Sequence, residues 1–94
     1  AAVNFKLYQN VPNPFNPATR IRFDLPRSTV IKLTIFNVKG QTIRNLYEGG
    51  VTAGRKEFTW DGRDDKKGLV ASGVYFYRLE AGEYSKTMKM ILLR

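Results

Sequence analysis

Apolar and polar residues alternate along most of the chain after residue 18. Between Thr19 and Leu25, apolar residues occupy every second position and charged residues lie between them, which is the period-two pattern of a half-buried strand. Pro26 ends this run, because proline has no amide donor for a strand ladder. The run Thr29 to Asn37 alternates in the same way and is rich in β-branched residues. Both runs therefore predict strands with one face toward a core.

Turn signals divide the rest of the chain into four further strand candidates. They cover Gln41–Tyr47, Arg55–Trp60, Gly73–Glu80 and Tyr84–Leu93. Short turns at residues 37–40 and 81–82 predict hairpins, whereas Gly49-Gly50 and Ala53-Gly54 are expected to break the chain. No window has helical periodicity. We therefore expect an all-β, immunoglobulin-like antiparallel β-sandwich of about seven strands, without the Cys and Trp pair of antibody domains.

The length and composition are those of one globular domain. The chain has 94 residues, of which 43% are hydrophobic and 26% charged, so a single two-layer core is the expected architecture. Its longest apolar cluster, Met90–Leu93, is much shorter than a membrane-spanning helix requires. We expect residues 1–94 to form one domain, with a proline-rich segment over 1–18 and the sandwich over 19–94.

The residue types that are missing exclude several chemistries. The chain has no Cys and no His, which excludes disulfides, Cys/His zinc sites, cysteine nucleophiles and histidine general bases. The remaining acid-base candidates are a few Asp and Glu residues in turns and strand ends. We therefore predict no enzymatic activity and no cofactor.

The net charge indicates a class of partner. Sixteen Lys and Arg residues against eight Asp and Glu residues give +8, which favours nucleic acid, acidic polysaccharide or a lipopolysaccharide-bearing surface. Much of this charge is expected to coat the solvent faces of the sheets. The basic residues on polar strand phases are mainly Arg20, Arg22, Lys32, Arg55, Lys56, Lys86 and Lys89. Because no nucleic-acid motif accompanies the charge, we predict no specific nucleic-acid partner.

Three prolines set Val11–Pro17 apart from the rest of the chain. Pro14 and Pro17 hold the preceding asparagines in extended conformations, and the segment cannot be a central strand. Phe15 is displayed by this stiff frame. Two roles remain open for Phe15: a plug for an open end of the sandwich, or a docking epitope.

Two further groups carry both a structural and a functional interpretation. Asp61, Asp64 and Asp65 could bind a cation such as calcium, but the neighbouring basic residues and the spacing favour Asx turns. Tyr75, Phe76 and Tyr77 lie in one run and could stack on sugars or bases if exposed, and Tyr75 and Tyr77 share one strand face. Core packing is favoured for both, because Val74 and Phe76 on the other face would bury this strand on both sides.

The tail Met88–Arg94 loses its alternation after Met90, so apolar residues lie on both faces up to the end. A buried closing strand explains this pattern, and so does a sheet edge that binds a partner. The two interpretations are compatible.

Several blocks, in order, resemble one known family. They are Leu7–Thr19, Ile35–Gly40, Trp60–Gly62, Ala71–Tyr75 and Lys89–Arg94. Together they resemble the type A C-terminal sorting domains of the bacterial type IX secretion system, over almost the whole chain. The same blocks also resemble the immunoglobulin-like domain of the flagellar hook-capping protein, a related family. The Pro-Asn-Pro-Phe opening and the Leu-Leu-Arg end favour the sorting family.

The resemblance implies a C-terminal module of a larger exported protein. Its partners would be the outer-membrane translocon, a surface sortase, the N-terminal cargo domains and an anionic lipopolysaccharide. The cargo would be secreted or held at the cell surface, through the periplasm, in a Gram-negative-type bacterium. The residues expected to be recognised are Pro12, Asn13, Pro14, Phe15, Lys89, Met90, Ile91, Leu92, Leu93 and Arg94. The alternative is a carbohydrate- or surface-binding module of a secreted hydrolase.

Overall fold

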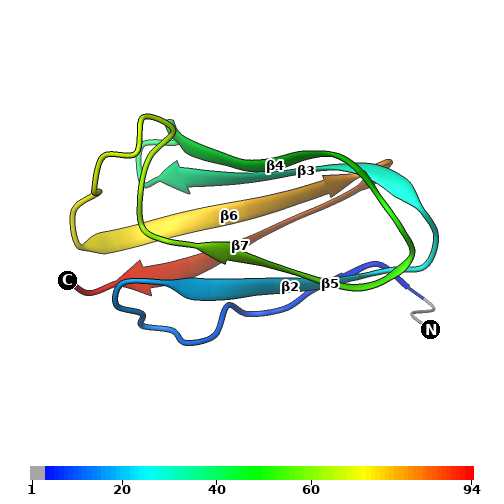
Figure 1. Ribbon diagram of the computed structural model, residues 1–94, viewed down its shortest axis with the longest axis horizontal. Helices are drawn as coiled ribbons and strands as arrows, with labels where there is room; N and C mark the ends of the chain where they lie inside the picture. The colour runs from blue at the N-terminus through cyan, green and yellow to red at the C-terminus, as the bar shows by residue number, and fades with distance from the viewer. Residues whose placement is uncertain (1–3) are drawn as a thin grey trace.

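Seven β-strands build the two layers of an immunoglobulin-like sandwich, and most of them form where the sequence alternates (Figure 1). The computed structural model describes residues 4–94. Its strands are β1 (Lys6–Leu7), β2 (Thr19–Leu25), β3 (Thr29–Asn37), β4 (Thr42–Val51), β5 (Gly54–Trp60), β6 (Gly73–Ala81) and β7 (Tyr84–Leu92). Over these residues the chain has no helix, and therefore no helix that could cross a membrane.

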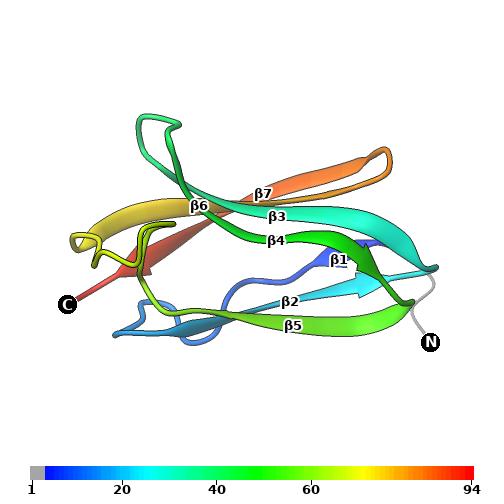
Figure 2. The ribbon, with the colours of Figure 1, turned by 45° about the horizontal axis from the view of Figure 1, so that its top comes forward.

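The strands pair in antiparallel fashion in two sheets, ordered β1-β2-β5 and β4-β3-β6-β7. Figure 2 shows the two sheets facing each other, with the C-terminus and the turn between β3 and β4 at the same end of the molecule. The inward phase of each strand fills the space between the sheets. The largest fully buried side chains include Ile21, Phe23, Leu25, Ile31, Leu33, Ile35, Trp60, Tyr77 and Met90. The predicted fold class is confirmed.

The bounds of β2 and β3 are those that the alternation predicts, and both predicted hairpins are present. In the first hairpin turn the Asn37 side-chain oxygen accepts hydrogen bonds from the Lys39 and Gln41 amides. The short strand β1 was not predicted. It pairs with only two residues of β2, Asp24 and Phe23, and two residues are too few for a periodic signal.

The expected break at residues 49–50 is wrong. Strand β4 continues through both glycines, and its ladder with β3 pairs Gly49 with Ile31 and Gly50 with Val30. The Tyr47 side chain lies over Gly49, and its hydroxyl donates a hydrogen bond to the Gly50 carbonyl. An aromatic neighbour thus covers the backbone that the glycines leave bare, and the strand continues.

Candidate recognition surface

The two segments predicted to be recognised lie side by side, although they stand at opposite ends of the sequence. The Phe15 amide donates to the Ile91 carbonyl at 3.0 Å, and the Leu93 amide donates to the Phe15 carbonyl at 3.0 Å. These bonds form a parallel bridge between Phe15 and Leu92. The proline segment therefore runs along the outer edge of β7.

Side chains extend this contact along the same edge. The Asn13 side-chain oxygen accepts a hydrogen bond from the Ile91 amide at 2.9 Å. The Gln9 side-chain amide donates to the Lys89 carbonyl at 2.8 Å. Together with the bridge at Phe15, these bonds occupy outward backbone groups of β7 from Lys89 to Leu93. A further strand cannot pair there without displacing the proline segment.

Phe15 belongs to the core. Its side chain is only 2% exposed, and its ring lies 5.6 Å from the Trp60 ring, centroid to centroid, in a tilted arrangement. The Trp60 ring in turn packs edge-on against Tyr75 at 5.4 Å. Of the two roles left open for Phe15, the plug is confirmed, and the exposed epitope is wrong because the core already holds the ring.

A buried polar network fixes the start of the proline segment. The Asn10 amide donates to the Tyr77 hydroxyl at 2.9 Å, and that hydroxyl donates to the Tyr8 carbonyl at 2.7 Å. The Asn10 side chain donates to the Thr19 hydroxyl, which donates to the Pro12 carbonyl. Burial raises the pKa of Tyr77 to about 12, so the phenol stays protonated. No sequence pattern marks Asn10 or Tyr77 as partners.

The tail is a closing strand whose two faces differ. Met90 and Leu92 are fully buried, Ile91 is half-buried and Lys89 is exposed. Leu93, just beyond the strand, is 53% exposed. The predicted buried strand is confirmed, and its other face still presents apolar and basic side chains to solvent.

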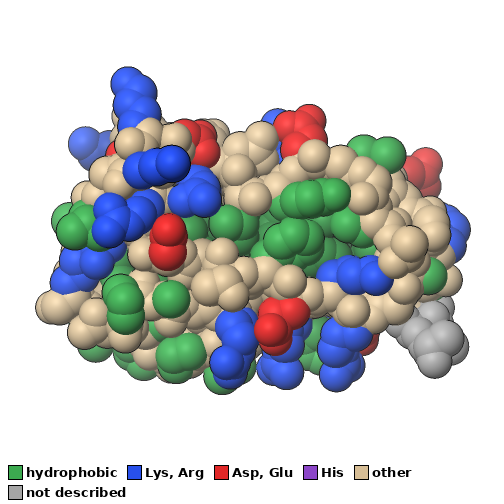
Figure 3. All heavy atoms as spheres, in the orientation of Figure 1, with side chains coloured by type: hydrophobic (Ala, Val, Ile, Leu, Met, Phe, Trp, Pro, Cys, Tyr) green, Lys and Arg blue, Asp and Glu red, His purple; other side chains and the backbone are tan. Residues whose placement is uncertain are grey.

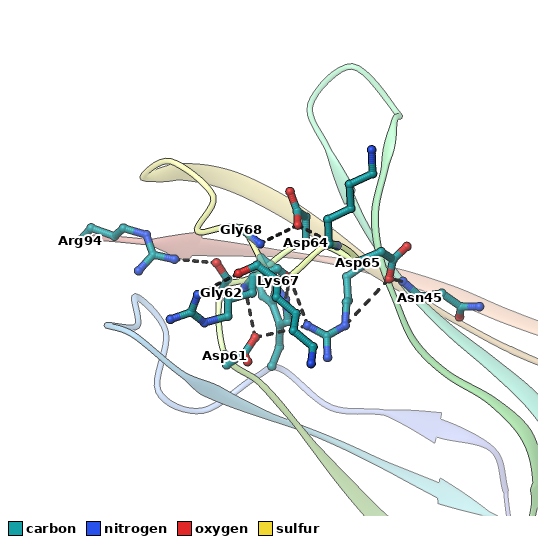
Figure 4. Close-up of polar contacts among 12 residues, drawn as sticks. Asn45, Asp61, Gly62, Asp64, Asp65, Lys67, Gly68 and Arg94 are labelled. Atoms are coloured by element: carbon teal, nitrogen blue, oxygen red, sulfur yellow. Dashed lines mark hydrogen bonds and ion pairs between the residues drawn. The ribbon is translucent and has the colours of Figure 1, made fainter.

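Arg94 holds the tail to the loop after β5. Its guanidinium donates to the Val70 carbonyl at 2.6 Å and to the Gly62 carbonyl at 2.5 Å (Figure 4), and its amide donates to the Ser72 hydroxyl. Gly62 has a φ of +73°, and a Cβ there would stand 2.7 Å from Arg94 Nη2. The contact therefore depends on glycine at position 62.

The acidic loop 61–68 is built by turn chemistry. Asp61 Oδ1 accepts from the Arg63 amide, and Asp64 Oδ1 accepts from the amides of Lys66 and Gly68 (Figure 4). These bonds confirm the Asx-turn interpretation. The carboxylates are engaged by backbone amides and by neighbouring cations, and the structure does not gather them around one point.

Tyr75 and Tyr77, two of the three aromatic residues considered for stacking, are buried, and Phe76 is half-buried. Trp60, Tyr75 and Tyr77 all belong to the core, and the Tyr75 hydroxyl donates to the Ala71 carbonyl at 2.7 Å. The predicted packing role is confirmed. A flat ligand has no access to the rings of the core residues, which removes them as residues for sugar binding.

Basic side chains are spread over much of the face shown in Figure 3, including the border along β2 and β5. On this sheet Arg55 pairs with Asp24 at 2.9 Å, and the Tyr8 hydroxyl also donates to Asp24. Arg55 and Tyr8 hold the pKa of the Asp24 carboxyl below its usual value. Part of the charge is thus neutralised locally, as expected for solvated sheet faces.

Two lysines do not follow the predicted polar phase. Lys56 is paired in register with Phe23, and Lys86 with Leu79, so both share the core-facing phase of their strands. Both lie on strands at a sheet edge, β5 and β7, where a long side chain can reach solvent from the inner face.

The likeness to solved structures is one of fold. The chain is similar to dimeric latent PorU from Porphyromonas gingivalis, with a TM-score of 0.72 and 17% identity over 93% of this chain and 9% of that one. It is also similar to PorZ, an essential surface component of the type IX secretion system of the same organism. That comparison has a TM-score of 0.63 and 22% identity, and it covers 94% of this chain and 11% of PorZ. A third similar structure is FlgD from P. aeruginosa, with a TM-score of 0.63 and 23% identity over 79% of this chain and 58% of that one. The chain thus spans less than two thirds of each.

A search of curated proteins finds no match. The FlgD Ig-like domain family, in contrast, matches residues 11–86, which include six of the seven strands wholly or in part. The match also includes all of Val11–Pro17 and Trp60–Gly62. On this evidence the chain belongs to the FlgD Ig-like domain family.

Proposed function

We propose that the chain is a non-catalytic sorting domain at the C-terminal side of a larger exported bacterial protein. The outer-membrane type IX translocon recognises it and directs the cargo to export or surface attachment. The observation that carries this proposal is the contact between the proline segment and β7, through the bridge between Phe15 and Leu92. Two segments chosen independently from the sequence form one continuous surface.

The geometry favours recognition of a folded surface rather than of a free strand. Pro12, Asn13 and Pro14 are exposed, and so are Lys89 and Leu93. The buried members of the two segments, among them Phe15, hold these exposed side chains in place. Because the proline segment occupies the β7 edge from Lys89 to Leu93, the translocon would read exposed side chains there, and the tail would not add to a partner's sheet.

The comparisons support the choice of secretion system. PorZ, one of the similar structures, is a surface component of the type IX system, and the likeness covers nearly the whole of this chain. A sortase that removes the domain, the N-terminal cargo domains and an anionic lipopolysaccharide are the further partners of this proposal. Its location is the cell surface or the medium, reached through the periplasm of a Gram-negative-type bacterium. The carbohydrate-binding alternative is not favoured, because Trp60, Tyr75 and Tyr77 are buried.

An export assay tests the proposal. The domain is fused to a fluorescent cargo with a periplasmic leader, in a bacterium that has this secretion system. One variant lacks Leu93 and Arg94, so that buried Met90 and Leu92 stay in place, and another carries Lys89→Glu. Lys32→Glu is the matched control, because Lys32 is an exposed lysine of the same sheet, on β3.

We expect the intact domain and Lys32→Glu to release the cargo from the cell, and the two tail variants to leave it in the periplasm. Thermal melts of the purified variants must show that they remain folded. Retention of the intact fusion in the periplasm, or equal export by every variant, would contradict a sorting role.

A further inference from the structure

The solvent-facing side of the four-stranded sheet is divided into an apolar end and a polar end. In one row of the ladder Phe36 is paired with Phe76, and in the next row Val74 is paired with Ile91. All four side chains are half-buried. At the other end of the same face, Lys32 and Ser85 flank Glu80. The apolar side chains are therefore gathered at the end where the tail lies.

Val38, in the turn after β3, extends this apolar end and is 68% exposed. We call Phe36, Val38, Val74, Phe76 and Ile91 the outer apolar patch. The patch adjoins the surface formed by the proline segment, because the Ile91 backbone bonds Asn13 and Phe15 at the edge of β7. Contiguous exposed apolar residues on a domain of this size commonly mark an interaction site.

Basic residues border the patch on its β7 side and at the turn after β3, whereas Asp64 and Asp65 lie near Thr42, the β4 partner of Phe36. Lys89 lies beside Phe76 in the ladder, and Lys39 follows Val38 in the turn. The Arg78 guanidinium lies over the Phe36 ring, with Cζ 4.4 Å from the ring centroid. Its Nε also pairs with Glu80 Oε1 at 3.2 Å, and Glu80 lies on the side away from the patch. The rows that contain Phe36 and Val74 hold no carboxylate among the paired residues. An occupant should supply negative charge opposite the basic residues, beside an apolar centre.

We propose that the outer apolar patch docks a protein whose surface has an apolar centre bordered by carboxylates. This deepens the proposed function, because it states the chemistry of the translocon surface that faces the sheet. A second copy of the domain does not fit, because the cations of the two copies would face each other. A lipid surface fits poorly, because half-buried rings on a flat sheet cannot enter a bilayer as a protruding apolar face does.

The chain offers a matched pair of variants. Val38 and Val30 are both valines, 68% and 67% exposed, near opposite ends of β3. We expect Val38→Asp to lower export of the fluorescent fusion about tenfold, because it places a carboxylate opposite the partner's carboxylates. Val30→Asp should export like the unmodified domain. A photo-cross-linking amino acid at position 38, but not at position 30, should yield an envelope-protein adduct that Lys89→Glu abolishes.

Each outcome decides the proposal. If Val38→Asp exports normally while removal of Leu93 and Arg94 stops export, the patch is overturned and the sorting role stands. If even the intact fusion stays in the periplasm, the sorting role fails, and the cross-link decides the patch: an adduct sensitive to Lys89→Glu keeps it, and no adduct overturns it. Binding to phosphatidylglycerol vesicles that Val38→Asp abolishes would identify a lipid surface and overturn the protein partner.

Discussion

Two irregular segments cover the two edge strands of the four-stranded sheet, and they do so by different means. The proline segment pairs with β7 through backbone bonds at Phe15 and inserts the Phe15 ring into the core. Loop 61–68 covers β4 through Asp65, whose amide donates to the Ile43 carbonyl and whose carboxylate accepts from the Asn45 amide. We call these two segments the covers of β7 and β4. The proline segment is anchored in the core by Phe15, whereas loop 61–68 lies on the surface of the protein.

The difference shows that the same turn-rich composition can have very different energetic weight. Both covers satisfy edge groups that would otherwise be open to foreign strands. Only the proline segment also removes a large apolar side chain from water. We therefore expect its loss to unfold the domain, and the loss of the loop contact to have a local effect.

The first prediction concerns the plug. Phe15→Ala should lower the free energy of unfolding by about 3 to 5 kcal/mol, because it leaves a cavity against Trp60. Urea titration of the purified domain measures this change. Val11→Ala, in the same segment at a side chain that is 40% exposed, is the control and should change little. Similar losses for the two variants would show that Phe15 does not anchor the segment.

The second prediction concerns the network at the start of the proline segment. Tyr77→Phe removes the hydroxyl that bonds the Asn10 amide and the Tyr8 carbonyl. Two buried backbone groups then lack a partner, which should lower the free energy of unfolding by about 1 to 3 kcal/mol. The same urea titration provides the measurement. An unchanged midpoint would mean that water replaces the hydroxyl there.

Tyr77 also gives the domain a dependence on alkaline pH. Burial raises its pKa to about 12, whereas the unfolded chain releases this proton near about pH 10. The unfolded state thus loses the proton first, so stability is complete below about pH 10 and falls as the pH rises toward about 12. Tyr77→Phe should flatten this decline. Urea titrations at pH 8, 10 and 11, chosen to span about the unfolded pKa, measure the free energy of unfolding of both proteins. If the pKa of Tyr77 were not raised, this free energy would fall with pH equally in the unmodified domain and in Tyr77→Phe.

Much of the fold follows from local pattern. The bounds of β2 and β3 were predictable because a buried apolar residue recurs at every second position of each strand, which is a local sequence signal. The predicted strand ended at Tyr47, whereas β4 continues through Gly49 and Gly50, and the Tyr47 side chain lies against Gly49. The Gly-Gly pair in the sequence predicts a turn, and it gives no information about where the Tyr47 side chain lies.

The candidate site was predictable only as separate parts. Each segment drew attention by its own composition, prolines in one and a loss of alternation in the other. Their contact joins residues 78 positions apart, Asn13 and Ile91, and periodicity carries no information about such pairs. The same holds for Arg94 and Gly62, where the only sequence signal is a glycine that turn chemistry already explains.

A fourth prediction concerns the contact between Arg94, at the end of the tail, and Gly62 in loop 61–68. Gly62→Ala places a Cβ 2.7 Å from Arg94 Nη2 and 3.1 Å from the Pro17 carbonyl oxygen, at a φ of +73°. Gly82→Ala is the matched control, with a φ of +61° and nothing within 4 Å. In each variant the backbone strain of an alanine at positive φ should lower the free energy of unfolding by about 1 to 2 kcal/mol. Only Gly62→Ala should also shift the NMR signal of the Arg94 side chain, and an unshifted signal would show that Arg94 is not held there.

The smallest effect is expected on the β4 side. The Asp65 side chain is 55% exposed, and Arg44 lies 3.9 Å from it, so Asp65→Ala should lower the free energy of unfolding by no more than about 1 kcal/mol. The loss should instead be local, because the Asn45 amide loses its acceptor. Hydrogen exchange should become faster at Asn45 and stay unchanged at the Phe15 amide, which bonds Ile91 on the other edge. Equal acceleration at both amides would mean that the two covers open together, and that the loop, like the proline segment, is part of the cooperative core.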